Sequence, residues 1–256
     1  MALDQQKIMQ AVSYLKTAQS ILFITGAGIS AESGLPTYRG VGGLYNDQLT
    51  EDDIPIETAV SGLMLELRPE VTWTYLAKME QACRNATFNP AHKIIAEMEQ
   101  HFARVWVLTQ NVDGFHKAAG SNNVIDIHGD HHHLSCMQCD YKNVVEDYRH
   151  LDIPPLCPDC TGLLRPDVIL FGELLPQKQV NQMTVEVNRG FDLIFSIGTT
   201  STFPYIYDPV TQAARNNVPT IEINPTETCL SDIVSVKFTT GAVDTLTAIW
   251  QKFQAP

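Results

Sequence analysis

The chain has 256 residues, of which 44% are hydrophobic and 18% charged, and its 17 Lys plus Arg against 29 Asp plus Glu leave a formal net charge of -12. This length and composition predict a globular protein with one large domain, or one domain with a smaller insert, and exclude a repeat array or a disordered tail. Because affinity for nucleic acid and for anionic membranes depends on basic surface, we expect neither as a partner.

The apolar runs and the first residues bear on the location of the protein. No apolar run approaches the roughly 20 residues that a membrane span requires. Residues 1–10 lack the basic start and the apolar run of a signal peptide. We therefore expect a cytoplasmic protein, in which the six cysteines need an explanation other than disulfide bonds.

Strand and helix patterns alternate along most of the chain. An opening helix is expected over 4–18, where Ile8, Val12 and Leu15 have helical spacing and Asp4 can cap the first turn. Apolar runs typical of buried parallel strands occur at 21–25, 105–109, 124–127, 193–197, 220–223 and 236–239. Helix patterns separate most of these runs, at 91–101, 114–119, 177–188, 205–216 and 243–253. This order predicts an α/β fold whose parallel sheet is covered by helices on both faces.

Two stretches interrupt the alternation. Residues 33–89 begin with a loop rich in Gly, Pro, Tyr and Arg and continue as helical pieces, whereas residues 129–165 hold four cysteines and show little periodicity. Both leave the sheet after a strand, so we expect them to form a small domain beside it. Ligands of open α/β sheets bind beyond the carboxyl ends of the strands, which places the expected active site between the sheet and these inserts.

The segment 26–31, Gly-Ala-Gly-Ile-Ser-Ala, matches the dinucleotide-binding pattern G-x-G-x-x-G/A directly after a predicted strand. Glycines let the backbone approach a pyrophosphate, whose charge a helix N-terminus stabilises. The alternative is an ordinary tight turn from strand to helix, and the motif alone does not separate the two. A loop at 33–45 stands where a dehydrogenase would have a second strand with an acidic residue, which favours a nucleotide site closed by a loop over hydride transfer.

Four cysteines, Cys136, Cys139, Cys157 and Cys160, form two C-x-x-C pairs separated by 17 residues. Each pair fits two corners of a tetrahedron, and the spacing is typical of a zinc ribbon. A redox dithiol is the alternative, but it needs a single pair at the start of a helix. Because four thiolates leave no open coordination position, we expect one structural zinc ion.

Polar residues follow two of the predicted strands. Asn111 and Asp113 come after the run at 105–109, and His128 follows the run at 124–127. At strand ends that face a crevice, Asn can bind an amide or a sugar, Asp can accept from a carboxamide, and His can act as a base. The alternative is that Asn111 and Asp113 cap a helix and His128 bonds a backbone carbonyl. The three histidines at 131–133 are interpreted as solvated loop residues, with a weak adventitious metal site as the alternative.

Taken together, these segments resemble the sirtuins, a family of NAD-dependent protein lysine deacylases. The resemblance is to members of the bacterial type. The matching segments occur in family order at 26–30 with 33–36, 109–113, 128–129, the two cysteine pairs, 165–166 with 171–173, 198–200 and 223–225. The resemblance implies a Rossmann-like NAD-binding domain made of 1–33, 90–128 and 166–256. It also implies a smaller domain, made of a cofactor loop and helical module at 34–89 and a zinc-binding module at 129–165.

The implied reaction consumes NAD as a co-substrate. The carbonyl oxygen of an acyl-lysine attacks C1′ of the nicotinamide ribose and expels nicotinamide, which leaves an imidate. His128, which matches the family's base, then activates a ribose hydroxyl to attack the imidate carbon, and water completes the cleavage. The products are free lysine, nicotinamide and O-acyl-ADP-ribose. The expected partners are acylated-lysine proteins or peptides, and the expected state is a monomer. Protein mono-ADP-ribosyl transfer and a non-enzymatic NAD-sensing module are the alternatives.

The resemblance also implies roles around NAD. Asp113 is expected to bind the nicotinamide carboxamide, while Asn111, the second catalytic residue, and Ser30 line the nicotinamide and ribose pocket. Tyr38 stands where many members have Phe and is expected to shield the ribose intermediate. The remaining expected contacts to ribose, phosphate and adenine are Gly26, Ala27, Gly28, Arg39, Gln110, Gly198, Thr199, Thr200, Asn224 and Ala242.

The acyl-lysine is expected to lie over Phe171. Main-chain bonds from Ile169, Gly172 and Glu173 would pair the substrate backbone as an added strand.

The acyl preference depends on one helix of the insert. Sirtuins that remove succinyl or malonyl groups resemble one another in a Tyr-x-x-Arg pair, and alignment through Trp73 places Leu76 and Met79 at these positions. A shift of one residue would place Tyr75 and Lys78 there instead. Because an acyl carboxylate buried against Leu and Met would lack a partner, we predict removal of acetyl and longer uncharged groups over succinyl.

Overall fold

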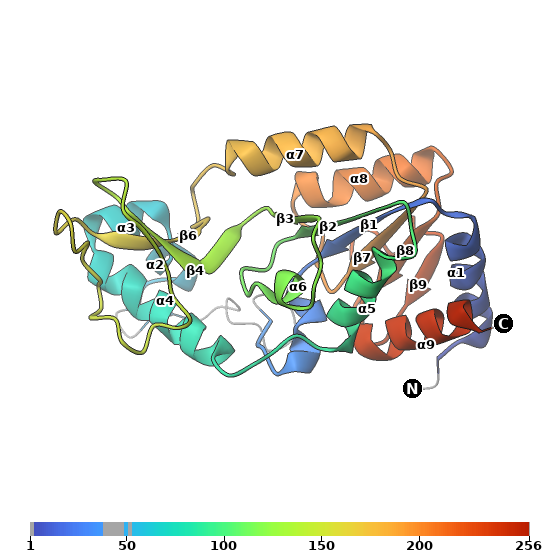
Figure 1. Cartoon of the computed structure of the whole chain (residues 1–256), viewed down its shortest axis with the longest axis horizontal. Coiled ribbons are helices and arrows are strands. Elements are labelled where there is room, and N and C mark those ends of the chain that lie inside the picture. Colours follow the sequence, from blue (N-terminus) through green and yellow to red (C-terminus); the bar gives the residue numbers. More distant parts are fainter. Residues whose placement is uncertain (1–2, 38–48, 51–52, 256) are drawn as a thin grey trace.

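The computed structural model describes residues 3–37, 49–50 and 53–255. Its larger part is a parallel sheet in the order β3-β2-β1-β7-β8-β9 (Figure 1). The strands are β1 (Ser20–Thr25), β2 (Arg104–Thr109), β3 (Val124–Asp126), β7 (Leu193–Ile197), β8 (Thr220–Ile223) and β9 (Val236–Phe238). This confirms the predicted Rossmann-like sheet. The strand order reverses between β1 and β7, which is where open α/β sheets bind ligands.

Helices cover both faces of this sheet (Figure 1). Alternate residues of β1 enter two separate cores, since Phe23 packs with residues of α1, α5 and α9 while Ile24 packs with residues of α7 and α8. Burial on both sides explains why each strand is a continuous apolar run. The helices, including the short α6, are α1 (Gln5–Thr17), α5 (Pro90–Met98), α6 (Phe115–Ala118), α7 (Gln177–Asn188), α8 (Pro204–Arg215) and α9 (Ala242–Gln254).

The glycine-rich segment after β1 differs from the strand-to-helix turn that was the alternative to a dinucleotide-binding loop. It forms two short 3-10 turns, Ala27–Ile29 and Ala31–Ser33, rather than the start of an α-helix. Gly28 packs directly against Gly198, the residue after β7, because a Cβ on Gly28 would lie 2.5 Å from the Cα of Gly198. The Gly28 N–H also donates to the Gly198 carbonyl at 2.8 Å. These glycines therefore allow two loops to touch through backbone atoms at the point where the strand order reverses.

The smaller part combines three helices with a second sheet (Figure 1). The helices are α2 (Ile56–Ala59), α3 (Gly62–Leu67) and α4 (Pro69–Cys83), and the antiparallel strands β4 (Gly129–Cys136), β5 (Lys142–Val144) and β6 (Leu164–Val168) follow the order β5-β4-β6. Trp73 of α4 is fully buried and its indole N–H donates to the Leu164 carbonyl at 2.9 Å, which joins the helices to the sheet. The sequence predicts the helical pieces but not these strands, since most of their side chains remain partly exposed.

Strand β4 contains an irregularity near its start. Asp130 pairs with Asp167, but the next pair is Leu134 with Pro166, so the ladder skips residues 131–133. Such bulges bend a strand and redirect its side chains.

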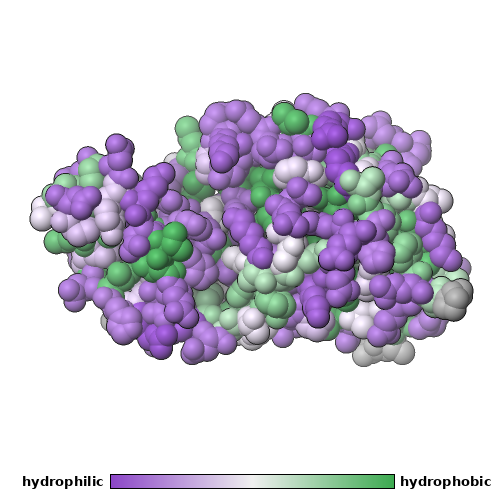
Figure 2. All heavy atoms as spheres, in the orientation of Figure 1, coloured by the Kyte–Doolittle hydropathy of each residue, from purple (hydrophilic) through white to green (hydrophobic). Residues whose placement is uncertain are grey.

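Within the described ranges, no helix is long and apolar enough to cross a membrane. Figure 2 shows hydrophilic residues over most of one face, with hydrophobic residues in separate groups.

Candidate active site

A cavity of about 620 Å³ lies beyond the carboxyl ends of β1, β2 and β7 and is bounded on its other side by α4 and the residues after β6. A second cavity, of about 10 Å³, shares Ala27 and Asn111 with it and is also lined by Ser30 and Asp113. Tyr38 and Arg39 lie outside the described residues. The large cavity is lined by the other predicted NAD and substrate residues, namely Gly26, Ala27, Gly28, Leu76, Met79, Gln110, Asn111, His128, Ile169, Phe171, Gly172, Glu173, Gly198, Thr199, Thr200, Asn224 and Ala242.

Ser30 is the centre of a buried hydrogen-bond network. Its hydroxyl donates to Asp113 Oδ2 at 2.7 Å and accepts from Asn111 Nδ2 at 3.2 Å. The same Asn111 amide lies 3.2 Å from the Gly26 carbonyl, so β1 and β2 are cross-linked at their ends. Burial raises the pKa of Asp113, although the Phe115 N–H and the Ser30 hydroxyl both donate to its carboxylate. The network holds a carboxyl group and an amide at the wall of the small cavity.

Two buried histidines support this network and were missed by the sequence analysis. His92 Nδ1 lies 3.3 Å from the Asn89 backbone nitrogen and 3.1 Å from Asn89 Oδ1 in the capping box of α5, and its Nε2 faces the Ser30 hydroxyl at 3.4 Å. His116 Nε2 lies 2.9 Å from the Thr25 hydroxyl. Burial lowers the pKa of His92 to about 4 and that of His116 well below its ordinary value, so both rings are neutral. No sequence pattern indicates that His92 faces Ser30.

His128 is held through both of its ring nitrogens. Its Nδ1 lies 3.0 Å from the Gln110 carbonyl, which can only accept, so this nitrogen carries the proton. Its Nε2 lies 2.7 Å from the Tyr205 hydroxyl and accepts from it. The Tyr205 ring stacks on Phe203, and both aromatic residues line the large cavity. The arrangement leaves Nε2 as the basic nitrogen.

Tyr205 is a further residue that the sequence analysis missed. It lies in the first turn of α8, and no sequence pattern indicates that its hydroxyl reaches His128.

Thr199 links the loops on the other side of the cavity. Its hydroxyl accepts from Gln110 Nε2 at 2.8 Å, and its carbonyl accepts from Asn224 Nδ2 at 2.9 Å. Three residues predicted to contact ribose or phosphate are therefore positioned by one another. The Gly26 N–H donates to the Ile197 carbonyl at 3.0 Å, so its amide is occupied within the sheet.

The predicted peptide-binding segment is fixed against the helices of the smaller part. The Phe171 N–H donates to the Val60 carbonyl at 3.1 Å, and the Ile169 N–H donates to the His128 carbonyl at 2.9 Å. A substrate bond at Ile169 would therefore use its carbonyl oxygen. Arg165 binds both carboxylate oxygens of Glu173, at 2.6 and 2.9 Å, which holds the turn after Phe171 in place.

The two candidate acyl-selecting pairs occupy different positions on α4. Leu76 and Met79 line the large cavity. Lys78 instead places its ammonium 4.8 Å from the centre of the Tyr75 ring, and neither residue lines the cavity. Among the described residues, the cavity lining contains no Lys or Arg but does contain Glu80.

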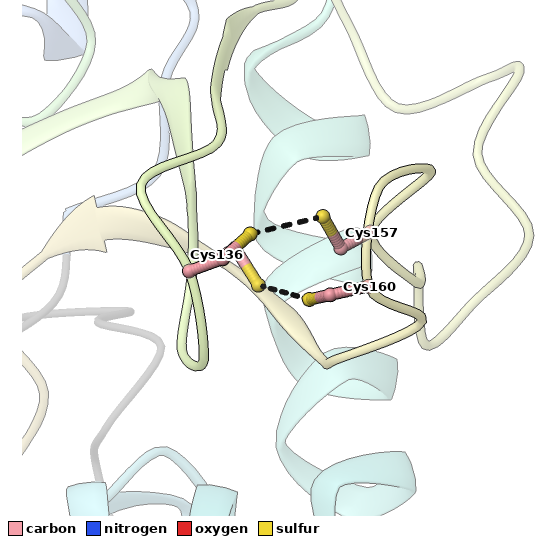
Figure 3. Close-up of side chains that lie close together, drawn as sticks. Cys136, Cys157 and Cys160 are labelled. Carbon is pink, nitrogen blue, oxygen red and sulfur yellow. Dashed lines mark hydrogen bonds between the residues drawn. The ribbon is translucent and has the colours of Figure 1, made fainter.

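The four cysteines of the predicted zinc ribbon converge between the end of β4 and the loop before β6 (Figure 3). The sulfur atoms of Cys136 and Cys160 are 3.4 Å apart, and those of Cys139 and Cys157 are 3.6 Å apart. Zn–S bonds of about 2.3 Å in a tetrahedron would place sulfurs about 3.8 Å apart. The distances and the thiol donor set therefore fit one zinc ion.

The three histidines after Asp130 differ from the interpretation as solvated loop residues. They lie in the bulge of β4, where His131 and His132 are half-buried and only His133 is exposed. His131 also lines the large cavity.

Residues 26–203 match the model of the Sir2 family. The chain is 47% identical over 233 residues to a Pseudomonas aeruginosa protein named NAD-dependent protein deacylase 2, and the match covers 90% of this chain and 91% of the relative. It is 36% identical over 220 residues to an Aquifex aeolicus protein named NAD-dependent protein deacylase, with 86% and 89% covered.

Solved structures agree with these sequence matches. A crystal structure of a Sir2 homologue in complex with NAD is similar at a TM-score of 0.84 and 31% identity, and covers 99% of this chain and 94% of that chain. A structure of Sir2 with a p53 peptide and NAD+ is similar at a TM-score of 0.81 and 26% identity, with 98% of each chain covered.

Proposed function

Because this chain belongs to the Sir2 family, we propose that it is an NAD-dependent protein lysine deacylase that releases nicotinamide and O-acyl-ADP-ribose. The observation that carries the proposal is the placement of His128. Its basic Nε2 faces the cavity that Asn111 and the predicted ribose-binding residues also line. A cavity of about 620 Å³ is of the size expected for a large cofactor-like ligand.

His128 would act as the general base in this reaction. The Gln110 carbonyl fixes the proton on Nδ1, so Nε2 can take the proton of a ribose hydroxyl. The Tyr205 hydroxyl occupies Nε2 and must give way when that ribose hydroxyl approaches. His128 and Asn111 are thus the catalytic pair that we propose.

The network around Ser30 would hold the nicotinamide end of NAD. Asp113 is buried and raised in pKa, and the N–H groups of a carboxamide would stabilise its charged form. Asn111 lines both cavities, whereas Asp113 lines the small one, and at the large cavity Asn111 would orient the ribose. Further contacts would come from the residues that Thr199 links, and from Tyr38 and Arg39.

The acyl-lysine would enter beside Phe171 and reach the wall formed by Leu76 and Met79. An acetyl or longer aliphatic group gains from this apolar surface, whereas the described residues of the cavity lining offer no cation to a succinyl carboxylate. We therefore propose deacetylation, extended to longer uncharged groups, as the preferred activity.

The four-cysteine site would hold a structural zinc ion that orders the small sheet. In the division that we propose, 1–33, 90–128 and 166–256 bind NAD, 34–89 supply the cofactor loop and helices, and 129–165 bind zinc. Thiols that must stay reduced to bind metal fit a reducing compartment, so we place the protein in the cytoplasm. We propose that it acts as a monomer.

Nicotinamide release with and without an acetyl-lysine peptide tests the proposal. Deacylation requires that release depends on the peptide and that ADP-ribose leaves with the acyl group. With NAD labelled in its ADP-ribose part, label on an unmodified protein substrate would instead indicate ADP-ribosyl transfer. Binding of NAD without peptide-dependent release would indicate a sensing module, and either result would reject the deacylase.

A further inference from the structure

The bulge in β4 gathers three potential metal ligands outside the four-cysteine site. A carboxylate oxygen of Asp130 and ring nitrogens of His131 and His132 all lie within 4.8 Å of one another. Successive side chains of a regular strand point to opposite faces, so three consecutive residues could not converge there. The interruption between Asp130 and Leu134 is what brings them together.

Hydrogen bonds already orient these side chains. His131 Nδ1 lies 2.5 Å from the Val112 carbonyl and donates to it, which leaves Nε2 as the nitrogen that can bind a metal. His132 Nδ1 lies 2.9 Å from Asp130 Oδ1, and the Tyr148 hydroxyl donates to the His131 carbonyl at 2.6 Å. Histidine ligands of metals are commonly fixed by a carbonyl at the other ring nitrogen, and His131 is held in this way.

The surroundings of the three residues favour a cation. Asp113 and Glu80 lie close enough to act electrostatically on His132, and Asp126 acts on Asp130. Two basic side chains pair with these acidic groups, since Lys117 binds Asp126 and Arg84 binds Glu80. On the other side, Gly114 covers the cluster with backbone only, since a Cβ there would lie 3.6 Å from both Asp130 Oδ2 and His132 Nδ1.

We propose that Asp130, His131 and His132 form a second metal site, which takes a divalent transition-metal ion. Two imidazoles and one carboxylate suit zinc, nickel and copper, whereas calcium and magnesium prefer oxygen ligands alone. Three protein ligands leave coordination positions for water, so the ion exchanges more readily than one held by four thiolates.

Nickel titration of the zinc-loaded protein by calorimetry tests the site, with zinc content measured before and after. The wild type should bind one nickel ion while its ribbon zinc is retained. His132→Gln and Asp130→Asn should each weaken nickel affinity at least tenfold. Because neither NAD nor peptide is present, the result does not depend on the proposed deacylase activity.

His150→Gln is the matched control, because His150 is an exposed histidine of the same part of the chain. It should bind nickel as the wild type does. Thermal unfolding of each variant shows whether a loss of affinity is a loss of fold, and His131→Gln gives a second variant if His132→Gln does not fold. Absence of saturable nickel binding in the wild type, equal affinity in the ligand variants, or loss of affinity in His150→Gln would each overturn the proposal.

Discussion

The two sheets of this protein are stabilised in different ways. The larger sheet is buried on both faces by helices, and stacking of Phe23 on Phe195, with ring centres 4.9 Å apart, links adjacent strands in one of its cores. The smaller sheet has a limited apolar core around Trp73 and Leu134, and four cysteines cluster at its far end. Structure that comes from apolar burial is visible as periodicity in a sequence, whereas structure that comes from metal ligands is visible only as ligand spacing.

The largest expected effect is the loss of zinc from the smaller sheet. Cys160→Ser should release the ion, because structural zinc contributes on the order of 10 kcal/mol of apparent binding free energy to folding. Hydrogen exchange should then show amides of β4 and β6 losing protection while those of β1 and β7 keep theirs. Cys229→Ser, outside the cluster, is the control. Retained zinc and unchanged exchange in Cys160→Ser would contradict this account of the smaller sheet.

His128→Ala, at the junction of the two parts, should lower catalytic activity without lowering thermal stability. Removal of a general base is expected to lower kcat/KM for deacylation by about 10²–10⁴. Thermal stability should change little, because the side chain is only partly buried. His150→Ala controls for the loss of a histidine elsewhere. Turnover close to that of the wild type in a folded variant would remove His128 from the mechanism.

Acid should lower the free energy of unfolding of the larger part for a reason unrelated to zinc. The pKa of His92 is lowered by burial to about 4, so this histidine contributes stability that is complete above about pH 6.5 and is lost as pH falls toward 4. The full loss is about 3 kcal/mol. His92→Gln should therefore reduce the fall in unfolding free energy between pH 7 and pH 4.5, measured by denaturant titration. Release of the proposed zinc ion would affect both proteins alike, so an identical fall would refute the role of His92.

The acyl preference tests the surface that the smaller part presents to the cavity. On one peptide, kcat/KM for acetyl- and butyryl-lysine should exceed that for succinyl-lysine at least tenfold, because Leu76 and Met79 offer no partner to a carboxylate. Met79→Arg should reduce the preference for acetyl- over succinyl-lysine, because the guanidinium would bind the succinyl carboxylate. A succinyl preference in the wild type would favour Tyr75 with Lys78 instead.

The smallest expected effect concerns Tyr205, which belongs to the larger part. Tyr205→Phe keeps the ring but removes the hydroxyl that NAD must displace from His128 Nε2. The KM for NAD should fall a few-fold with kcat nearly unchanged. Phe203→Leu, which alters the stacked neighbour but leaves this hydrogen bond, serves for comparison. A large fall in kcat would show that the hydroxyl takes part in the reaction.

The difference between the sheets also limits what could be predicted from the sequence. The strands of the larger sheet and the helices between them were placed to within a few residues, because burial on both faces leaves unbroken apolar runs. Cys136 and its partners were found by spacing alone. The strands β4, β5 and β6 were not predicted, since their side chains are largely half-exposed and β4 is interrupted by a bulge.

Some residues of the candidate site could be predicted from the sequence and others could not. Asn111, Asp113 and His128 could be found because they follow predicted strands, where side chains face the crevice. His92 and Tyr205 could not, because each reaches the site from a helix through one hydrogen bond between residues far apart in the chain. Contacts of this kind depend on the packing of α5 and α8 against the sheet, which no local pattern records.

The contact between Gly28 and Gly198 has a consequence for how the molecule can open. The two loops touch through backbone atoms and share a hydrogen bond, so the two halves of the parallel sheet cannot separate there without breaking it. The wall of the cavity that the parallel sheet forms is therefore braced, and a bulky ligand would have to displace the opposite wall, formed by α4 and the residues after β6.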